Sequence, residues 1–112
     1  MNKRADKYLL DILMAIELIE EFIPSDYSFS DYLKDRKTSS AVERQLAIIG
    51  EAVNHYEKLA IKTSLNNKSQ IIALRNRLIH AYDSIDDNAI WAVIKKDLPL
   101  LKNEVQNLLK PN

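Results

Sequence analysis

Five side chains that could carry out chemistry lie within one eight-residue stretch of this chain: Arg75, Asn76, Arg77, His80 and Tyr82. An arginine binds anions through paired N–H donors of fixed geometry. A histidine has an ordinary pKa near 6.5, so it can accept or donate a proton at cellular pH. The asparagine amide and the tyrosine phenol add hydrogen-bonding groups. The convergence of these groups predicts a functional site on this segment.

A helix from about Lys68 to Tyr82 must position these groups, and the connection Leu65-Asn66-Asn67 before it predicts an asparagine N-cap. On a wheel of about 100° per residue, Tyr82 falls about 20° from Arg75. Asn76 and His80 form a neighbouring polar strip. The apolar residues within about 60° of Arg75 are Ile71, Ile72, Leu78 and Ile79. This pattern places an arginine in the middle of an apolar stripe, where it needs an anionic partner.

Each residue also has a structural explanation. Arg75 could form an internal salt bridge to Glu43 or Glu51 on the preceding helix. His80 could be a satisfied, partly buried histidine, and Tyr82 could end the core stripe. Together, however, the groups favour a site over these separate explanations.

Positive charge gathers around the same helix, although the formal net charge of the protein is zero. No acidic residue occurs between Glu57 and Asp83, and the cations in that interval are Lys58, Lys62, Lys68, Arg75 and Arg77. This arrangement suits a phosphate-bearing partner. A solvated helix face is the alternative interpretation.

The rest of the chain predicts an all-α protein, because one glycine and three prolines are too few for the turns of antiparallel sheets. Apolar residues recur at helical spacing before Pro24, between Thr38 and about Ala60, and from the Asp83–Asp87 turn to about Leu109. Ser28 and Asp31 resemble a capping box for a single helical turn through Leu33. Pro99 should kink or split the last helix, and Gly50 predicts the close approach of another helix backbone. We expect a four- to five-helix up-down bundle that forms one domain over residues 1–112.

Composition excludes several classes of site. The absence of cysteine excludes disulfides and thiolate metal centres. The first apolar run is interrupted by Asp11, Glu17 and Glu20, so we expect no signal peptide or membrane span and a cytoplasmic protein. No set of histidine and carboxylate residues has convincing metal-ligand spacing, and His55 is expected to be a surface residue without an assigned role.

Arg75-Asn76-x-x-x-His80-x-Tyr82 resembles the Arg-x4-6-His signature of HEPN domains, with the His-x-Tyr ending of the HepT branch. The resemblance covers nearly the whole chain, although Asn66-Asn67-Lys68-Ser69 stands where relatives often carry a proline and tryptophan. The further similar blocks are Asp11-Ile12-Leu13, Ala15-Ile16-Glu17, Ala41-Val42-Glu43-Arg44-Gln45-Leu46, Ile48-Ile49-Gly50-Glu51-Ala52, Trp91 and Lys96-Asp97-Leu98-Pro99.

This resemblance implies a helical bundle that forms a homodimer through the motif helix, with an RNA-cutting site shared across the interface. It implies an endoribonuclease that needs no metal or other cofactor and leaves 2′,3′-cyclic phosphate products. Arg75 and His80 would be catalytic, and Asn76, Arg77 and Tyr82 would support RNA binding. It further implies the toxin of a type VII toxin–antitoxin system, silenced when an MntA-type nucleotidyltransferase antitoxin transfers AMP to Tyr82.

Two other functions use the same residues. The chain could be a non-catalytic docking partner of a nucleotidyltransferase, or a structural dimer in which Arg75 and His80 belong to an interface network. The intact Arg75–His80 pair favours the ribonuclease, because a pure adaptor has no evident need for it.

Overall fold

The computed structural model describes residues 3–59, 65–80 and 86–110, except for the side chains of Arg77, Ile79 and His80. Every regular element in these ranges is helical, so the all-α prediction is confirmed. The elements are α1 (Lys3–Phe22), α2 (Phe29–Lys34), α3 (Arg36–Lys58), α4 (Ser69–His80), α5 (Asp87–Ala92), the π-helical segment η1 (Val93–Asp97) and α6 (Leu98–Leu109).

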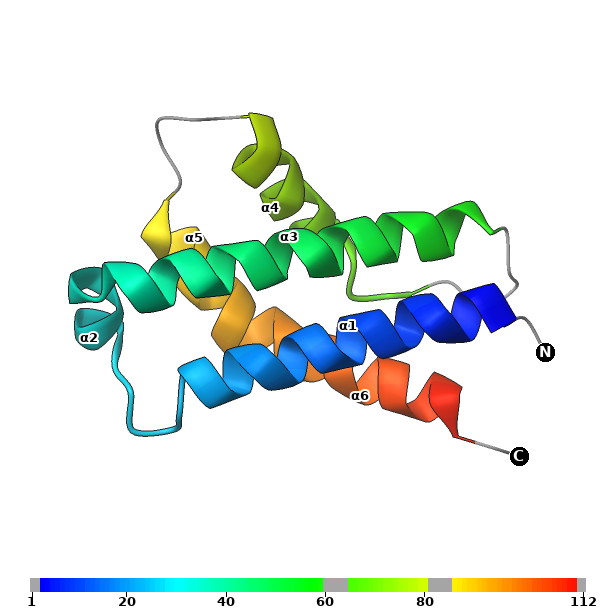
Figure 1. Cartoon of the computed structure of the whole chain (residues 1–112), viewed down its shortest axis with the longest axis horizontal. Coiled ribbons are helices and arrows are strands. Elements are labelled where there is room, and N and C mark those ends of the chain that lie inside the picture. The colour runs from blue at the N-terminus through cyan, green and yellow to red at the C-terminus, as the bar shows by residue number, and fades with distance from the viewer. Residues whose placement is uncertain (1–2, 60–64, 81–85, 111–112) are drawn as a thin grey trace.

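The two longest helices, α1 and α3, run side by side in opposite directions along the long axis of the molecule (Figure 1). Their facing sides carry apolar residues at steps of three and four, which pack as in a helix bundle. The fully buried side chains of this seam are Ile12, Ile16, Ile19, Val42, Leu46, Ile49 and Val53. α6 packs on α1, whereas α4 packs mainly on α3 and also contacts η1. The position of α4 therefore depends chiefly on α3.

The helix boundaries follow from side-chain caps. At the start of α2, Ser28 accepts the Asp31 N–H at 3.0 Å and Asp31 accepts the Ser28 N–H at 2.9 Å, so the predicted capping box is confirmed. α3 begins at Arg36, two residues before the expected start, because the Asp35 carboxylate accepts the Thr38 N–H at 3.0 Å. Its last helical residue is Lys58, and the expected end at Ala60 lies outside the described residues.

The last predicted helix is split, as Pro99 indicated. The chain passes from α5 through one π-helical turn, Val93–Asp97, into α6, where Pro99 occupies the first turn. A proline has no N–H to donate and its ring crowds the carbonyl four residues before it. A wider turn before the proline accommodates both effects.

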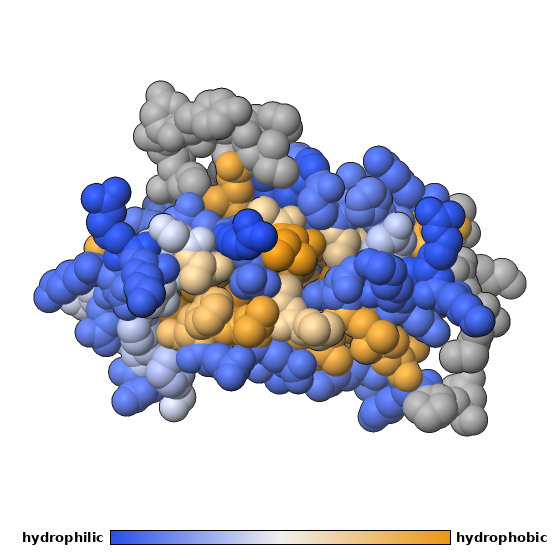
Figure 2. Space-filling view, in the orientation of Figure 1, coloured by the Kyte–Doolittle hydropathy of each residue, from blue (hydrophilic) through white to orange (hydrophobic). Residues whose placement is uncertain are grey.

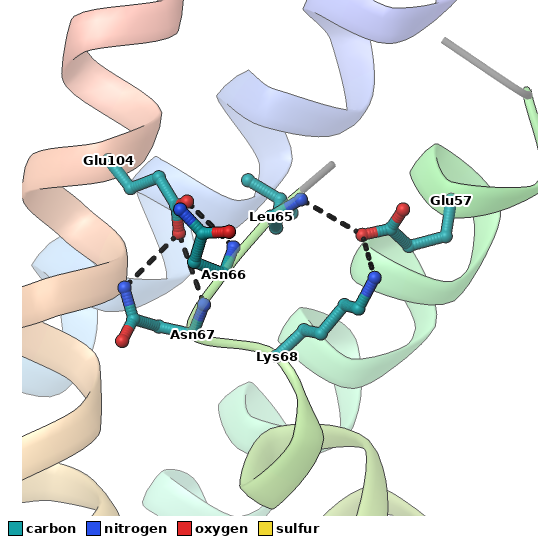
Figure 3. A network of polar contacts seen from close by, with 6 residues as sticks. All are labelled: Glu57, Leu65, Asn66, Asn67, Lys68 and Glu104. Atoms are coloured by element: carbon teal, nitrogen blue, oxygen red, sulfur yellow. Dashed lines mark hydrogen bonds and ion pairs between the residues drawn. The ribbon is translucent and has the colours of Figure 1, made fainter. Parts of the chain in front are cut away.

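The entry into α4 is held by carboxylates from two other helices (Figure 3). Glu104 of α6 accepts the Asn66 N–H at 2.7 Å, and it accepts both the backbone N–H and the side-chain amide of Asn67 at 3.3 Å. Glu57 of α3 accepts the Leu65 N–H and the Lys68 ammonium, both at 3.0 Å. The side-chain NH2 of Asn67 thus donates to Glu104, and the helix begins at Ser69, one residue after the expected start.

Gly50 lies where α3 and α4 touch. A Cβ added at this position would overlap the Cβ of Arg75 and lie 3.6 Å from its Cα. The expected close approach is therefore confirmed, and the approaching residue is Arg75 itself. No helix among the described residues is long and apolar enough to cross a membrane.

Replacing Gly50 with alanine should destabilise the protein. Alanine favours a helix by about 1 kcal/mol over glycine, but its methyl group would push against the stem of Arg75, and such overpacking typically costs about 1–3 kcal/mol. We expect Gly50→Ala to lower the free energy of unfolding by up to about 2 kcal/mol, which is the packing cost less the gain in helix propensity, measured by urea denaturation.

Ala47→Gly, one turn earlier on α3, is the matched control. It should lower the free energy of unfolding by about 1 kcal/mol through helix propensity alone. If Gly50→Ala instead stabilised the protein, the close contact at Arg75 would be wrong.

Candidate active site

Arg75 lies beside the buried face of α4. Among the described side chains of this helix, those of Ile71 and Leu74 are buried, and on the helical wheel they fall about 40° and 100° from Arg75, on the same side. Leu74 was not part of the predicted stripe, so the buried face extends further from Arg75 than the sequence pattern indicated. The Arg75 side chain is 20% exposed.

Glu51 of α3 forms an ion pair with the Nη2 of Arg75. The pair follows from the helix contact, because Gly50 lets the stem of Arg75 lie against α3 and Glu51 is the next residue. The internal salt bridge considered in the sequence is therefore present, and its partner is Glu51 rather than Glu43.

Glu43, the other acidic residue considered for Arg75, lies in a different environment. Burial, and to a lesser extent the charge of Asp87, raises the pKa of the Glu43 carboxyl above its usual value. Sequence spacing could not separate the two glutamates, since both lie on α3 at plausible positions. The glycine directly before Glu51 was the signal that could have selected it.

Asn76 lies next to Arg75 with an exposed side chain, and its amide oxygen accepts a hydrogen bond from Arg75 Nη1 at 2.9 Å. The third guanidinium nitrogen, Nε, is buried without a hydrogen-bond partner among the described residues. An arginine has five N–H donors, two on each terminal nitrogen and one on Nε. The terminal nitrogens are thus the ones through which Arg75 can reach an anion from solvent.

His55 is the second neighbour of Glu51, and sequence reasoning gave it no role. Its Nε2 lies 3.7 Å from the Glu51 carboxylate, one turn along α3, and its ring stacks on Tyr8 of α1 at 5.3 Å between centroids. The expected surface position is confirmed, because the side chain is 48% exposed. The stacking of Tyr8 on His55 could not be predicted from the sequence, because the two residues lie on different helices.

An open pocket of about 690 Å³ lies beside this cluster, between α1, α3 and the side of α4. Its lining includes Tyr8, Ile48, Glu51, His55 and Leu78. Next to it, Figure 2 shows an apolar band along the face that α1 and α3 present. The large apolar side chains exposed on these two helices are Leu10, Met14, Leu18 and Ile48.

The remaining predicted site residues are placed only in part. Arg77 and His80 belong to α4, and His80 is the last of its described residues, but the side chains of both are outside the described part of the protein. Tyr82 lies outside the described residues altogether. The structure therefore brings together Arg75 and Asn76 of α4 with Glu51 of α3, and the described part of α4 extends to His80.

The predicted concentration of positive charge is partly compensated. Lys68 pairs with Glu57 at 3.0 Å and Arg75 pairs with Glu51, so carboxylates of α3 face two of the cations of this region. In the ranges that the structure describes, no three histidine, cysteine or acidic residues lie close enough together to hold a metal ion.

Comparison with known proteins relates the sequence of this chain to a ribonuclease family. The model of the family described as "Ribonuclease HepT-like" matches residues 12–108. A protein of Thermococcus cleftensis named "Probable ribonuclease HepT" is 42% identical, over 96% of this chain and 99% of its own length.

Two further relatives are named as candidate ribonucleases. One from Caldanaerobacter subterraneus subsp. tengcongensis is 36% identical over 92% of both chains. One from Methanocaldococcus jannaschii is 35% identical over 95% of this chain and 98% of its own length. No solved structure matches the chain. With a family match across almost its full length, the chain belongs to the HepT-like ribonuclease family.

Proposed function

We propose that this protein is an endoribonuclease whose site is centred on Arg75 and His80 of α4. The observation that carries the proposal is the family match over residues 12–108, a range that contains α4 and therefore Arg75 and His80. The 20% exposure of Arg75 and its hydrogen bond to Asn76 support a guanidinium that is held in place yet open to a phosphate.

The reaction uses the nucleophile that RNA already carries. The 2′-hydroxyl attacks the adjacent phosphorus, the bond to the 5′-oxygen breaks, and the products are a 2′,3′-cyclic phosphate and a 5′-hydroxyl. His80 moves the proton, a role in which an imidazole contributes about 10²- to 10⁴-fold. Arg75 binds the phosphate as negative charge builds up on its oxygens. Asn76, Arg77 and Tyr82 help to bind RNA, and no step requires a metal ion.

The second part of the proposal is a homodimer in which two motif helices face one cleft. Its support is the apolar band of Leu10, Met14, Leu18 and Ile48, which lies beside the pocket that Leu78 of α4 borders. A monomer this small gains stability by covering such a band with a second copy. A band that continues to the edge of α4 would bring two copies of the site together.

The third part is regulation by a partner. We propose that the protein is the toxin of a type VII pair and that an MntA-type nucleotidyltransferase antitoxin silences it. The Tyr82 oxygen attacks the α-phosphorus of ATP, pyrophosphate leaves, and AMP remains on the phenol. The added phosphate carries negative charge close to Arg75 in the sequence, so it repels RNA by the same electrostatics that attract it.

Cleavage of RNA by the purified protein tests the first part. Wild type should cut a mixed-sequence RNA in the presence of EDTA and leave 2′,3′-cyclic ends, while Arg75→Ala and His80→Ala should each lose at least about 100-fold in rate. Gel analysis of end-labelled RNA gives the rate and the end chemistry.

Arg4→Ala, at an exposed position at the start of α1, is the control and should cut like wild type. Light scattering on the same preparations should give the mass of a dimer. Equal cutting by all variants would refute the catalytic assignment, and loss of cutting only with EDTA would refute the metal-free mechanism. A docking module would bind a nucleotidyltransferase and leave RNA intact.

Modification of Tyr82 is tested separately. Incubation with a cognate nucleotidyltransferase and ATP should add the mass of one AMP to wild type and abolish RNA cutting. Tyr82→Phe should gain no mass, and its rate of RNA cutting should be the same before and after the incubation, as read by intact-protein mass spectrometry and the RNA assay. Mass gained by Tyr82→Phe would show that the modified residue is a different one.

A further inference from the structure

The sequence motif assigns no function to Glu51, although it is the residue that contacts Arg75. The contact joins two helices: Glu51 is on α3, Arg75 is on α4, and the two helices touch at Gly50. Asn76 completes a chain of three side chains, because Arg75 pairs with Glu51 through Nη2 and donates to Asn76 through Nη1.

This chain of contacts restricts how Arg75 can meet a phosphate. Nε is buried, so the side edge of the guanidinium, formed by Nε and one terminal nitrogen, is closed to a ligand from solvent. Binding must therefore use the remaining N–H groups of the two terminal nitrogens. Which way those N–H groups point depends on the rotation of the guanidinium, and the contacts of its terminal nitrogens with the Glu51 carboxylate and the Asn76 amide restrict that rotation.

The pair is also placed where it can restrict motion. The Arg75 side chain is 20% exposed and the Glu51 side chain is 42% exposed, so the pair is neither fully solvated nor fully buried. A partly desolvated guanidinium keeps a counter-ion close, and truncating one partner leaves the other without compensation. The stem of Arg75 is meanwhile held against Gly50, which leaves the guanidinium end as the part that Glu51 must orient.

We propose that Glu51 is a positioning residue for RNA cleavage: its carboxylate holds the Arg75 guanidinium so that its terminal N–H groups meet the scissile phosphate. This inference rests on the proposed ribonuclease function. A carboxylate that merely repelled RNA would act in the opposite direction, because its removal would strengthen binding.

Single-turnover cleavage kinetics of Glu51→Gln, Glu51→Asp and Glu43→Gln separate these effects. Glutamine keeps the shape of Glu51 without its charge, and we expect a loss of about 10- to 100-fold in the maximal rate with a change in apparent KM below about threefold. Aspartate keeps the charge and should restore part of the rate. Glu43→Gln removes a carboxylate from the same helix and should keep the wild-type rate.

A wild-type rate in Glu51→Gln, or a rate or RNA affinity above wild type, would overturn the proposal. So would an equal loss in Glu43→Gln, which would indicate a general effect of charge. Thermal unfolding of each variant identifies any loss that comes from misfolding, and partial rescue by Glu51→Asp is not expected from misfolding.

The Arg75 Nε–H signal in NMR gives a readout that does not depend on activity. It should be sharp and slow to exchange with water in wild type and Glu43→Gln, and broad or fast to exchange in Glu51→Gln. If wild type does not cut RNA, the proposed function fails, and this signal still decides whether Glu51 holds Arg75. An unchanged signal in Glu51→Gln would refute the positioning role.

Discussion

The contact between α3 and α4 at Gly50 is the constraint on which the site depends. Because glycine leaves no side chain there, the stem of Arg75 lies directly against α3 and its guanidinium reaches Glu51. A larger residue would push α4 away and separate the ion pair. The close packing at Gly50 and the ion pair with Glu51 together thus determine where the Arg75 guanidinium lies.

The start of helix α4 is also held by carboxylates of other helices. Carboxylates of Glu57 and Glu104, from two other helices, hold the backbone that leads into Ser69 (Figure 3). Arg75 is fixed midway along the described part of the helix, and His80 is the last residue of that part. Acid–base groups work best when the element that carries them is held by its neighbours. Here the neighbouring groups are the carboxylates of Glu51, Glu57 and Glu104, which lie outside the sequence motif.

Helical periodicity and caps predicted much of this fold. The α1–α3 seam, the Ser28 capping box and the split near Pro99 depend on local rules, and the structure confirms them. The partner of Arg75 was harder to predict, because Glu43 and Glu51 both satisfy helical spacing and only the helix crossing selects one. Omitting Leu74 also shifted the predicted centre of the stripe toward Arg75. Contacts between segments far apart in the sequence, such as Glu104 of α6 with Asn67 before α4, have no periodic signal at all.

The central claim is that Arg75 acts on RNA in an orientation set by Glu51. A double-mutant cycle in cleavage rate tests it most directly, with wild type, Glu51→Gln, Arg75→Ala and the double variant under single-turnover conditions. If Glu51 acts only through Arg75, adding Glu51→Gln to Arg75→Ala should change the residual rate by less than about twofold. If Glu51→Gln lowers the rate of Arg75→Ala by the same factor as it lowers wild type, the two residues act independently and the account is contradicted.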